Sequence, residues 1–453
     1  MSGRHLDKMG RKDTMSNKVE NAIYDARELG KGKVIMLGLQ HMFAMFGATV
    51  LVPMLTGLNV STTLLFAGFG TLIFHLITKR KVPAFLGSSF AFLGGYFAIA
   101  PILEDGSSNV EMIPYACAGV ACAGLIYILM SALIKIFNVK RIMRFFAPIV
   151  TGPIIIAIGL TLSKSAIDNC SDNWLIAIVA IVVVVACNIF GKGMIAIIPI
   201  LIGVVVSYVA GIAMGEVDFG SVKEAAWFGI PIVKDMTILG MFGENFDASK
   251  LITAIITIMP IAIATIVEHM GDMSAISSTT GINYIKEPGL HRTLLGDGIA
   301  TIVAALFGAP ANTTYGENTG VLNLSKVYDP FVVRLAAVFA IIFSFCPKFA
   351  AIIQAMPVAT VGGISLILYG MISAVGIRNI VENKVDFTKS RNVIVAALIL
   401  VLSIGINYSA AGAVVFTIGS VTLSLSGLAV GAIVGIVLNA VLPGNEYIFD
   451  DGE

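Results

Sequence analysis

Two carboxylates stand out because they lie where a membrane-embedded chain holds a charge least easily. Glu317 sits in the polar, glycine-containing segment Ala311–Gly320, and Glu268 directly follows the apolar run Leu251–Val267. An ionisable side chain in lipid costs roughly 3 kcal/mol, and irregular backbone persists there only where protein or water satisfies its polar groups. Two carboxylates that bear this cost indicate a binding site inside a membrane.

The chemistry of such a pair favours a small planar solute over an anion. An ionised glutamate only accepts hydrogen bonds, whereas a protonated one also donates. Two glutamates combined with free backbone N–H groups therefore suit a ligand that presents both N–H and C=O edges, and they would repel a simple anion. Burial and the mutual repulsion of the two carboxylates both favour protonation, so either Glu268 or Glu317 can carry a coupled proton.

Glu268, Glu317 and Asp272 also have plainer structural interpretations. Glu268 could close a span and face water, and Glu317 could cap a half-helix behind it. Asp272 lies one helical turn after Glu268 on the same helix face, where it either tunes that carboxylate or is solvated at the helix end. The sequence leaves both interpretations open for each residue.

Other polar residues and the cysteines in the apolar runs are interpreted mainly as structural. His41 and His269 are placed to hydrogen-bond neighbouring helices, and Asp297, between two glycines, is placed to cap the start of a span. The five cysteines show no metal-ligand spacing and are interpreted as small packing residues. No metal or other cofactor is predicted.

The elements that must position these residues are membrane spans. Hydrophobic residues make up 57% of the 453 residues and charged residues only 13%, whereas a soluble domain carries about 25% charged residues. Runs such as Trp174–Phe190 and Met194–Met214 approach the roughly 20 residues that cross a bilayer as a helix. The composition therefore excludes a soluble enzyme, and the net charge of +1 argues against a nucleic-acid partner.

About fourteen hydrophobic segments follow one another along the chain. They begin near residues 34, 60, 82, 112, 142, 173, 194, 251, 294, 311, 331, 349, 391 and 412, and the third and tenth are short and broken. Basic residues concentrate after even-numbered segments, for example at Lys79–Lys81, and are fewer after odd-numbered ones. The first 33 residues are polar and basic, without a cleavable signal peptide. The pattern predicts a multi-pass membrane protein with both termini in the cytoplasm.

The second half of the chain repeats motifs of the first half. Gln40–Met42 is echoed by Glu268–Met270 at an offset of 228 (268 − 40), and Leu86–Ser89 by Tyr315–Asn318 at an offset of 229 (316 − 87). Two matches at nearly one offset indicate an internal duplication. Because each repeat holds seven spans, an odd number, the halves must insert with opposite orientations. That arrangement is typical of secondary transporters with a site in the middle of the membrane.

The two broken segments predict helix starts within the membrane. Pro83–Phe90 passes through a proline, a glycine and two serines before a short helix of about Ala91–Leu103. Asn312–Tyr315 is expected to be extended, with a turn at Gly316 and a short helix from about Asn318. Free N–H groups and partial positive charge at such helix starts suit carbonyl oxygens or anions.

These motifs resemble those of a known family. The segments Gln40–Pro53, Leu86–Phe92, Glu268–Gly271 and Thr314–Asn318 are similar to the nucleobase–ascorbate (nucleobase:cation symporter 2) transporters, which include the bacterial uracil permeases. The resemblance runs from about residue 30 to residue 443. Xanthine and urate carriers of this family usually have a Gln-Asn type pair where this chain has a Glu-Asn pair, which favours uracil.

The resemblance implies an all-α integral membrane fold of about fourteen spans. These spans would form two inverted seven-span repeats, with short β-strands in the third and tenth segments. A core domain would comprise residues 33–137 and 251–348, and a gate domain residues 138–215 and 349–443. An extracellular connection would cover 216–250, with tails at 1–32 and 444–453.

The resemblance also implies uracil–proton symport by an elevator-like movement of the core against the gate. Glu268 and Glu317 would bind the N–H and carbonyl edges of the pyrimidine, and the backbone N–H groups of Phe90 and Gly316 would bind its carbonyl oxygens. Tyr315 would lie beside the substrate.

Proton coupling is expected to involve Glu268, Glu317, Asp272 and His269. One departure from the family pattern bears on it. Uracil permeases carry a second histidine four residues after the motif glutamate, and this chain has Asp272 there. The departure affects the details of coupling and leaves the transporter class unchanged.

The implied partners are uracil, protons and the lipid of a bacterial inner membrane, and members of the family often form homodimers. Two alternatives keep the same architecture: a permease for xanthine or another purine, and an anion exchanger, which Glu317 opposes by its charge. An enzyme is not expected, because the sequence has no metal-ligand spacing and no nucleophile–base pair.

Overall fold

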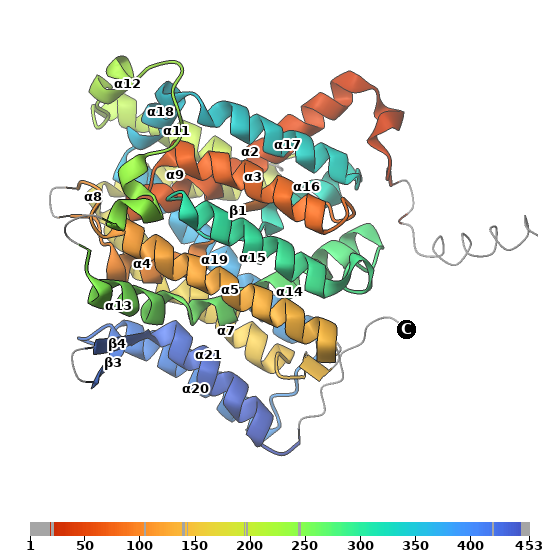
Figure 1. Ribbon diagram of the computed structural model, residues 1–453. Helices are drawn as coiled ribbons and strands as arrows, with labels where there is room; N and C mark the ends of the chain where they lie inside the picture. The colour runs from red at the N-terminus through yellow and green to blue at the C-terminus, as the bar shows by residue number, and fades with distance from the viewer. Residues whose placement is uncertain are drawn as a thin grey trace, which may run out of the picture.

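Helices that run side by side make up most of the chain, and a short two-stranded ribbon lies among them (Figure 1). The computed structural model describes residues 19, 22–103, 106–137, 141–142, 144–193, 195, 198–242, 246–418 and 421–444. The predicted tails lie outside this part of the chain, apart from residues 19, 22–32 and 444.

The first half of the chain alternates long helices with short ones. Its elements are η1 (Ala26–Leu29), α2 (Lys31–Thr56), α3 (Val60–Ile77), β1 (Leu86–Ser88), η2 (Phe90–Phe92), α4 (Leu93–Ile99), α5 (Ile113–Phe137), α7 (Pro148–Thr161), α8 (Ser163–Asp172), α9 (Trp174–Phe190) and α11 (Pro199–Met214). The predicted connection at 216–250 contains the short helices α12 (Gly220–Glu224), η3 (Lys234–Met236) and η4 (Ile238–Met241).

The second half begins with a helix that is broken by a proline. Its elements are α13 (Ala248–Ile258), α14 (Ile261–Thr280), η5 (Ile285–Gly289), α15 (Leu290–Leu306), β2 (Asn312–Thr314), α16 (Gly316–Ser325), α17 (Pro330–Ser344), α18 (Pro347–Gln354), α19 (Val358–Glu382), α20 (Ser390–Asn407), β3 (Ala413–Ile418), β4 (Val421–Ser426) and α21 (Gly427–Val441).

Seven helices of the described chain are long and apolar enough to cross a membrane. They are Lys31–Thr56, Val60–Ile77, Ile113–Phe137, Pro148–Asp172, Ala248–Thr280, Val358–Glu382 and Ser390–Asn407. An eighth can be made from α17 and α18, which are bent by 87° relative to each other. Shorter apolar helices, such as Phe90–Ile99 and Trp174–Phe190, lie between them. The structure is therefore that of a helical membrane protein, and the exact number of fourteen crossings stays a prediction.

Polar residues at the helix ends explain where several apolar helices start. Asn59, Asn173, Asp247 and Asp329 each precede a helix and accept a hydrogen bond from a backbone N–H of its first turn. Such caps satisfy N–H groups that have no partner within the helix. The caps thus divide long apolar stretches into separate helices.

Two segment boundaries differ from the prediction. The eighth segment does not stop before Glu268: α14 continues to Thr280, and the break lies earlier, at Met259–Pro260, because proline lacks the N–H that would continue the helix. The last segment, predicted from residue 412, begins with the β3–β4 hairpin, and its helix starts only at Gly427. The hairpin strands are rich in β-branched residues, which favour strands over helices.

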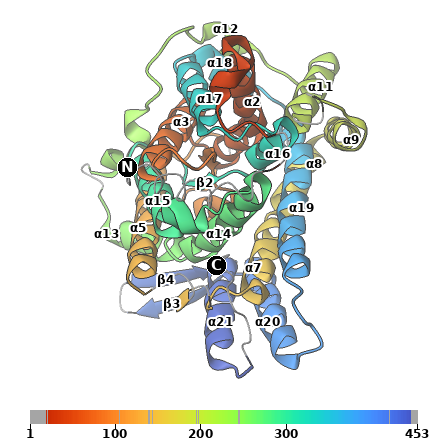
Figure 2. The same cartoon turned by 90° about the vertical axis from the view of Figure 1, so that its right-hand side faces the viewer.

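The helices form two groups. Figure 2 shows α2, α3, α5, α14 and α15 around β2, with α7, α9, α11, α19 and α20 together on one side of that group. Within the first group α15 packs on α3 and α5, and within the second α19 packs on α7 and α9. Two large apolar clusters, one containing Tyr96 and Tyr127 and the other Met45 and Tyr369, each include residues of both helix groups. Leu86 of β1 belongs to the first cluster, and Phe85, Phe90 and Tyr315, which flank the strands, belong to the second.

Candidate functional site

The ribbon of β1 and β2 lies at the centre of the candidate site. The strands are antiparallel, with Leu86 opposite Thr314 and Ser88 opposite Asn312. Two further backbone hydrogen bonds lengthen the ribbon, from Ser89 N to Ala311 O (2.8 Å) and from Tyr315 N to Phe85 O (3.0 Å). The strands predicted in the third and tenth segments are therefore present, and they pair with each other.

Two buried threonines attach the ribbon to neighbouring helices in the same way. The Thr71 hydroxyl on α3 accepts from Leu86 N (2.9 Å), and its single proton lies within reach of Ala67 O (2.8 Å) and Leu86 O (3.2 Å). The Thr301 hydroxyl on α15 accepts from Asn312 N (3.2 Å) and donates to Asn312 O (3.1 Å). The two threonines are 230 positions apart (301 − 71), close to the offsets of the repeated motifs.

A helix starts at the end of each strand of the ribbon. η2 begins at Phe90, after β1, and α16 begins at Gly316, after β2. Because the strands are antiparallel, these starts lie at opposite ends of the ribbon. Neither preceding side chain, Ser89 or Tyr315, caps its helix with a hydrogen bond. The first N–H groups of both helices are thus oriented to bind an acceptor.

The start of α16 faces open space. Gly316 is exposed although residues 311–315 before it are buried, and a Cβ added at Gly316 would meet no described atom within 4 Å. The helix begins at Gly316 itself, two residues earlier than predicted. The backbone of Glu317 is in the first turn of α16, and its side chain lies outside the part of the structure that is described.

Helix α14 brings the acidic residues against the ribbon. It packs on η2, β2 and α16, and Glu268 lies in its interior, half-buried. This placement does not support the interpretation of Glu268 as the last residue of a span. Asp272, one turn further, is also half-buried, and its Oδ2 accepts a hydrogen bond of 2.6 Å from the Thr314 hydroxyl of β2. Asp272 therefore contacts the ribbon and is not a solvated helix end.

His269 has a partner that the sequence did not suggest. Its Nδ1 lies 2.9 Å from Asp297 Oδ2, and both side chains are completely buried. Asp297 was predicted to cap the start of a span. It instead lies inside α15, which begins seven residues earlier at Leu290 with Gly289 as its N-cap. The glycines on either side of Asp297 make room for Phe74 and Tyr127, which pack closely against this part of α15.

Tyr315 packs across the ribbon. Its hydroxyl donates to Ser88 O (2.9 Å) and lies 3.3 Å from the Thr49 hydroxyl of α2. An added Cβ at Gly87 would come within 2.5 Å of the Tyr315 ring, so only glycine fits at this position of β1. The Tyr315 ring is buried, and the Ser88 hydroxyl donates in turn to Thr49 O (3.0 Å).

Two further contacts surround the helix starts. Asn318 of α16 donates to His41 O (3.0 Å) and lies 3.1 Å from His41 Nδ1 on α2, as expected for a histidine that bonds a neighbouring helix. The buried ring of Phe90 meets the Tyr369 ring of α19 edge-on, at 5.9 Å between centroids. The site is therefore bounded by α2, α14, α16 and α19.

Thr71, Thr301, the contact of Asn318 with His41 and the role of Asp297 were not predicted from the sequence. A longer comparison of the two halves would have paired Thr71 with Thr301, because their offset is close to that of the other repeats. No signal in the sequence pairs His269 with Asp297, since they lie on different helices. In chemical terms, the site combines carboxylate acceptors on α14 with two uncapped helix starts that donate.

The chain is similar in sequence to a permease family and to bacterial uracil permeases. A family model described as a permease family matches residues 32–412. The uracil permease of Bacillus caldolyticus is 40% identical over 438 residues, which cover 93% of this chain and 96% of that protein. The uracil permease of Bacillus subtilis strain 168 is 37% identical over 422 residues, covering 90% and 92% of the two chains.

Solved structures resemble the fold at low sequence identity. The overall structure of SLC26A9 has a TM-score of 0.61 and 12% identity, covering 92% of this chain and 66% of that one. The transmembrane domain of the cyanobacterium bicarbonate transporter BicA has a TM-score of 0.54 and 16% identity, covering 94% and 99%. These likenesses extend to the fold alone.

Proposed function

The chain belongs to the permease family, and from that premise we propose that it imports uracil together with a proton. As a member of this family it is a multi-pass membrane transporter and not an enzyme. The similar uracil permeases support uracil as the substrate. The proposal further comprises fourteen crossings, inverted repeats, cytoplasmic termini and an elevator-like movement.

One observation carries the substrate assignment: α14 packs the half-buried Glu268 against a ribbon from which two uncapped helices start. Uracil presents N–H and C=O groups on its edges. Glu268 and Glu317 accept from its N–H groups, and the N–H groups of Phe90 and Gly316 donate to its carbonyl oxygens. Tyr315 supports the ribbon beneath the substrate through its bond to Ser88.

The proposed movement divides the molecule along its two helix groups. The core carries the ribbon, α14 and the helices that attach the ribbon, and the gate carries α7, α9, α11, α19 and α20. The packing of helices within each group supports this division (Figure 2), and contacts of α2 with α11 and of α14 with α7 join the two groups. The matching attachment of both strands by Thr71 and Thr301 supports the inverted repeat.

An anion exchanger is the less favoured function. The likeness to the bicarbonate transporter BicA extends to the fold, and the acceptor-rich α14 would repel an anion. A purine permease is separated from a uracil permease by competition: xanthine must fail to displace labelled uracil.

Uptake of uracil into proteoliposomes under an inward proton gradient tests the proposal. We expect Glu268→Gln to reduce uptake at least tenfold, because a hydrogen bond to a charged group contributes about 1.5–3 kcal/mol. Glu287→Gln is the matched control, since Glu287 is exposed on η5 and binds Lys81. Full uptake by Glu268→Gln would refute the site.

The proton is tested separately through Asp272. Asp272→Asn keeps an acceptor for the Thr314 hydroxyl but cannot carry a charge, so uracil binding should persist while the pH dependence of uptake changes. Thr314→Val removes the same hydrogen bond and leaves the acid, and it should keep the pH dependence. An unchanged pH profile in Asp272→Asn would remove this residue from the proton path.

A further inference from the structure

The segment Ile23–Leu29, which we call the strap, joins the far ends of the two helices that carry the site. Tyr24 Oη donates to Thr280 O at the end of α14 (2.7 Å). Ile23 N donates to Lys326 O just after α16 (2.8 Å), and Ala26 N donates to Asp329 Oδ2 before α17 (2.8 Å). The strap also buries Ala26 in a small apolar cluster with α2 and α17.

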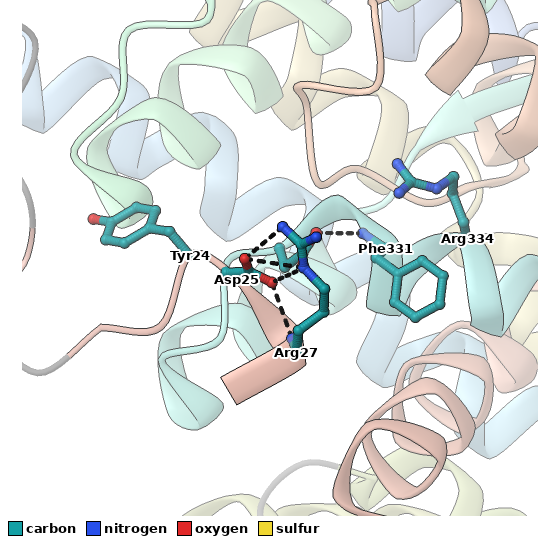
Figure 3. Close-up of a pocket in the computed structure, with 6 residues that line it drawn as sticks. Tyr24, Asp25, Arg27, Phe331 and Arg334 are labelled. Atoms are coloured by element: carbon teal, nitrogen blue, oxygen red, sulfur yellow. Dashed lines mark hydrogen bonds and ion pairs between the residues drawn. The ribbon is translucent and has the colours of Figure 1, made fainter. Parts of the chain in front are cut away.

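A pocket opens between the strap and the start of α17. Its volume of about 420 Å³ lies within the roughly 300–1,000 Å³ of small-molecule sites. Figure 3 shows that Tyr24, Asp25 and Arg27 line it from the strap, and Phe331 and Arg334 from α17. Asp329 completes the lining. The pocket is distant in the fold from the ribbon and takes no part in the proposed uracil site.

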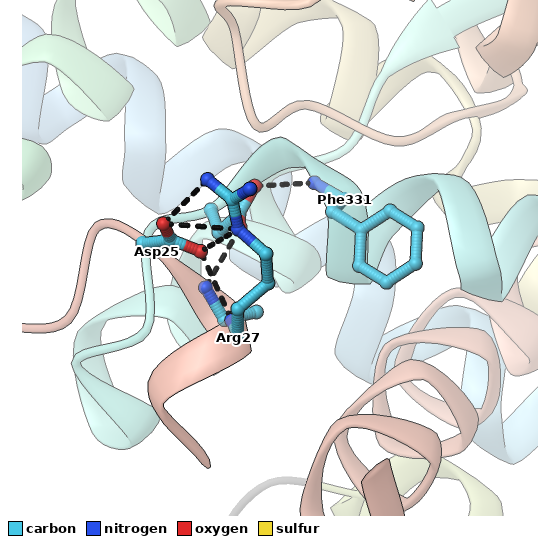
Figure 4. Close-up of polar contacts among 5 residues, drawn as sticks. Asp25, Arg27 and Phe331 are labelled. Carbon is cyan, nitrogen blue, oxygen red and sulfur yellow. Dashed lines mark hydrogen bonds and ion pairs between the residues drawn. The ribbon is translucent and has the colours of Figure 1, made fainter. Parts of the chain in front are cut away.

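Both carboxylates of the pocket already accept hydrogen bonds. Asp329 binds Ala26 N through Oδ2 and Phe331 N through Oδ1, each at 2.8 Å. Asp25 accepts from Arg27 Nη2 (2.7 Å) and Nε (2.8 Å), as Figure 4 shows. These bonds from Arg27 lower the pKa of Asp25, so its carboxylate stays ionised.

Arg334 has a hydrogen-bond donor that no described residue satisfies. Its Nη1 is buried and has no hydrogen-bond partner among the described residues. The guanidinium lies over the Phe331 ring, 5.6 Å from the centroid, which fixes its direction without satisfying its donors. The charges nearest in effect to Arg334 are the carboxylate of Asp329 and, more weakly, the guanidinium of Arg80. An arginine is always charged, and a buried donor without an acceptor is costly.

We propose that this pocket binds a phosphate group through Arg334, with Arg27 as a second, exposed donor. Guanidinium groups bind phosphate oxygens in a two-pronged geometry. The phosphate belongs either to an anionic lipid headgroup or to a small soluble phosphate compound. A lipid suits the position, because the exposed Phe331 and the apolar helix α17 lie beside the arginine. The two aspartates of the lining balance its two arginines in charge, so binding depends on the Arg334 donor that has no partner among the described residues.

Binding there would stabilise the strap and, through it, the ends of α14 and α16. The site is independent of uracil, so the proposal does not rest on the proposed function. It predicts that an anionic phosphate ligand raises the unfolding temperature of the purified chain without uracil.

Thermal unfolding of the full chain in neutral detergent tests this site. Phosphatidylglycerol, phosphatidylcholine and inorganic phosphate are added separately at constant ionic strength. We expect phosphatidylglycerol to raise the unfolding temperature and phosphatidylcholine to leave it unchanged. Stabilisation by inorganic phosphate to the same extent would assign the site to soluble phosphates. No effect of either anion would overturn the proposal.

Substitutions at Arg334 test whether the change in unfolding temperature arises from binding in this pocket. Arg334→Gln should weaken the apparent affinity for phosphatidylglycerol by about tenfold or more. Arg378→Gln is the matched control, because Arg378 is exposed on α19 and faces Glu382. If Arg334→Gln does not fold, Arg334→Lys keeps the charge but loses the two-pronged geometry, and it should also weaken binding. Unchanged affinity in the folded Arg334 variant would refute the site.

Discussion

His269 and Asp297 show how a buried polar pair fixes the position of α14. Their side chains meet at 2.9 Å between α14 and α15, with no exposed surface. His269 directly follows Glu268, so this contact also restricts the rotation of the helix that presents the candidate ligand. The free energy of this contact therefore affects the site, although both side chains are fully buried.

We expect Asp297→Ala to destabilise the protein strongly. Removal of one partner from a buried pair costs roughly 3–5 kcal/mol. The midpoint of thermal unfolding in detergent measures the loss, with Asp168→Ala on the exposed face of α8 as the control. The double variant His269→Ala/Asp297→Ala should lose less than the sum of the single variants. Additive losses would contradict a direct interaction.

The functional importance of a single residue was predictable from the sequence where a polar or irregular residue lies in an apolar membrane segment. Glu268 and Gly316 attract notice because an acid or a broken helix is costly in a membrane. Asp297 was misread because adjacent glycines suggested a helix end, whereas here they let other helices approach α15 closely. The partner of a buried residue depends on helix packing, which one sequence does not reveal.

The ribbon depends on its two threonine attachments. Thr71 and Thr301 each accept from the backbone N–H of one strand residue, on opposite strands. Thr301 also donates to that residue's C=O, whereas the Thr71 proton is shared between Leu86 O and the nearer Ala67 O. Strand edges in a membrane need such partners, since no water reaches them. Because each strand has one such threonine attachment, we expect the two helix starts to be stabilised to a similar extent.

We expect Thr71→Val and Thr301→Val to lower stability by similar amounts. Each leaves a buried N–H without its acceptor, at a cost of about 1–3 kcal/mol. Thermal unfolding of the two variants gives the comparison, and Thr388→Val on the exposed segment before α20 serves as the control. A large loss in one variant and none in the other would show that the two attachments are not equivalent.

The strands Leu86–Ser88 and Asn312–Thr314 were expected from the family resemblance. The residues alone indicated a broken segment at each place and an extended Asn312–Tyr315. The β3–β4 hairpin was not predicted. β3 is nearly as apolar as a helical span, but β4 alternates apolar and hydroxyl residues over Val421–Ser426, a strand pattern that the prediction missed. Periodicity cannot separate a short apolar strand from a buried helix. The contacts of the strap were also not predicted, because the polar N-terminal segment has no sequence pattern that indicates which surface it binds.

The two helix groups must move relative to each other if the proposed transport mechanism holds. Gly47 on α2 and Ile200 on α11 face each other across the groups: an added Cβ at Gly47 would lie 3.5 Å from Ile200 Cβ. That separation fits a disulfide, whose Cβ atoms are about 3.5–4.5 Å apart. A cross-link here would join the proposed core to the proposed gate.

We expect Gly47→Cys/Ile200→Cys, in a chain without its five native cysteines, to lose uracil uptake on oxidation and to regain it on reduction. Uracil binding should survive the cross-link. The control pair Gly211→Cys/Pro357→Cys joins α11 to the residue before α19 within the proposed gate, with Cβ atoms 3.7 Å apart, and it should keep uptake on oxidation. Undiminished uptake by the fully cross-linked Gly47/Ile200 variant would exclude relative movement at this contact.

Uracil binding to the purified chain tests the central claim most directly. A ligand that binds only the folded state raises the unfolding temperature with its concentration. We predict that uracil does so, that xanthine and bicarbonate do not, and that Glu317→Ala abolishes the effect. The account would be contradicted if uracil left the unfolding temperature unchanged, or if uracil raised the unfolding temperature of Glu317→Ala as much as that of the unmodified chain.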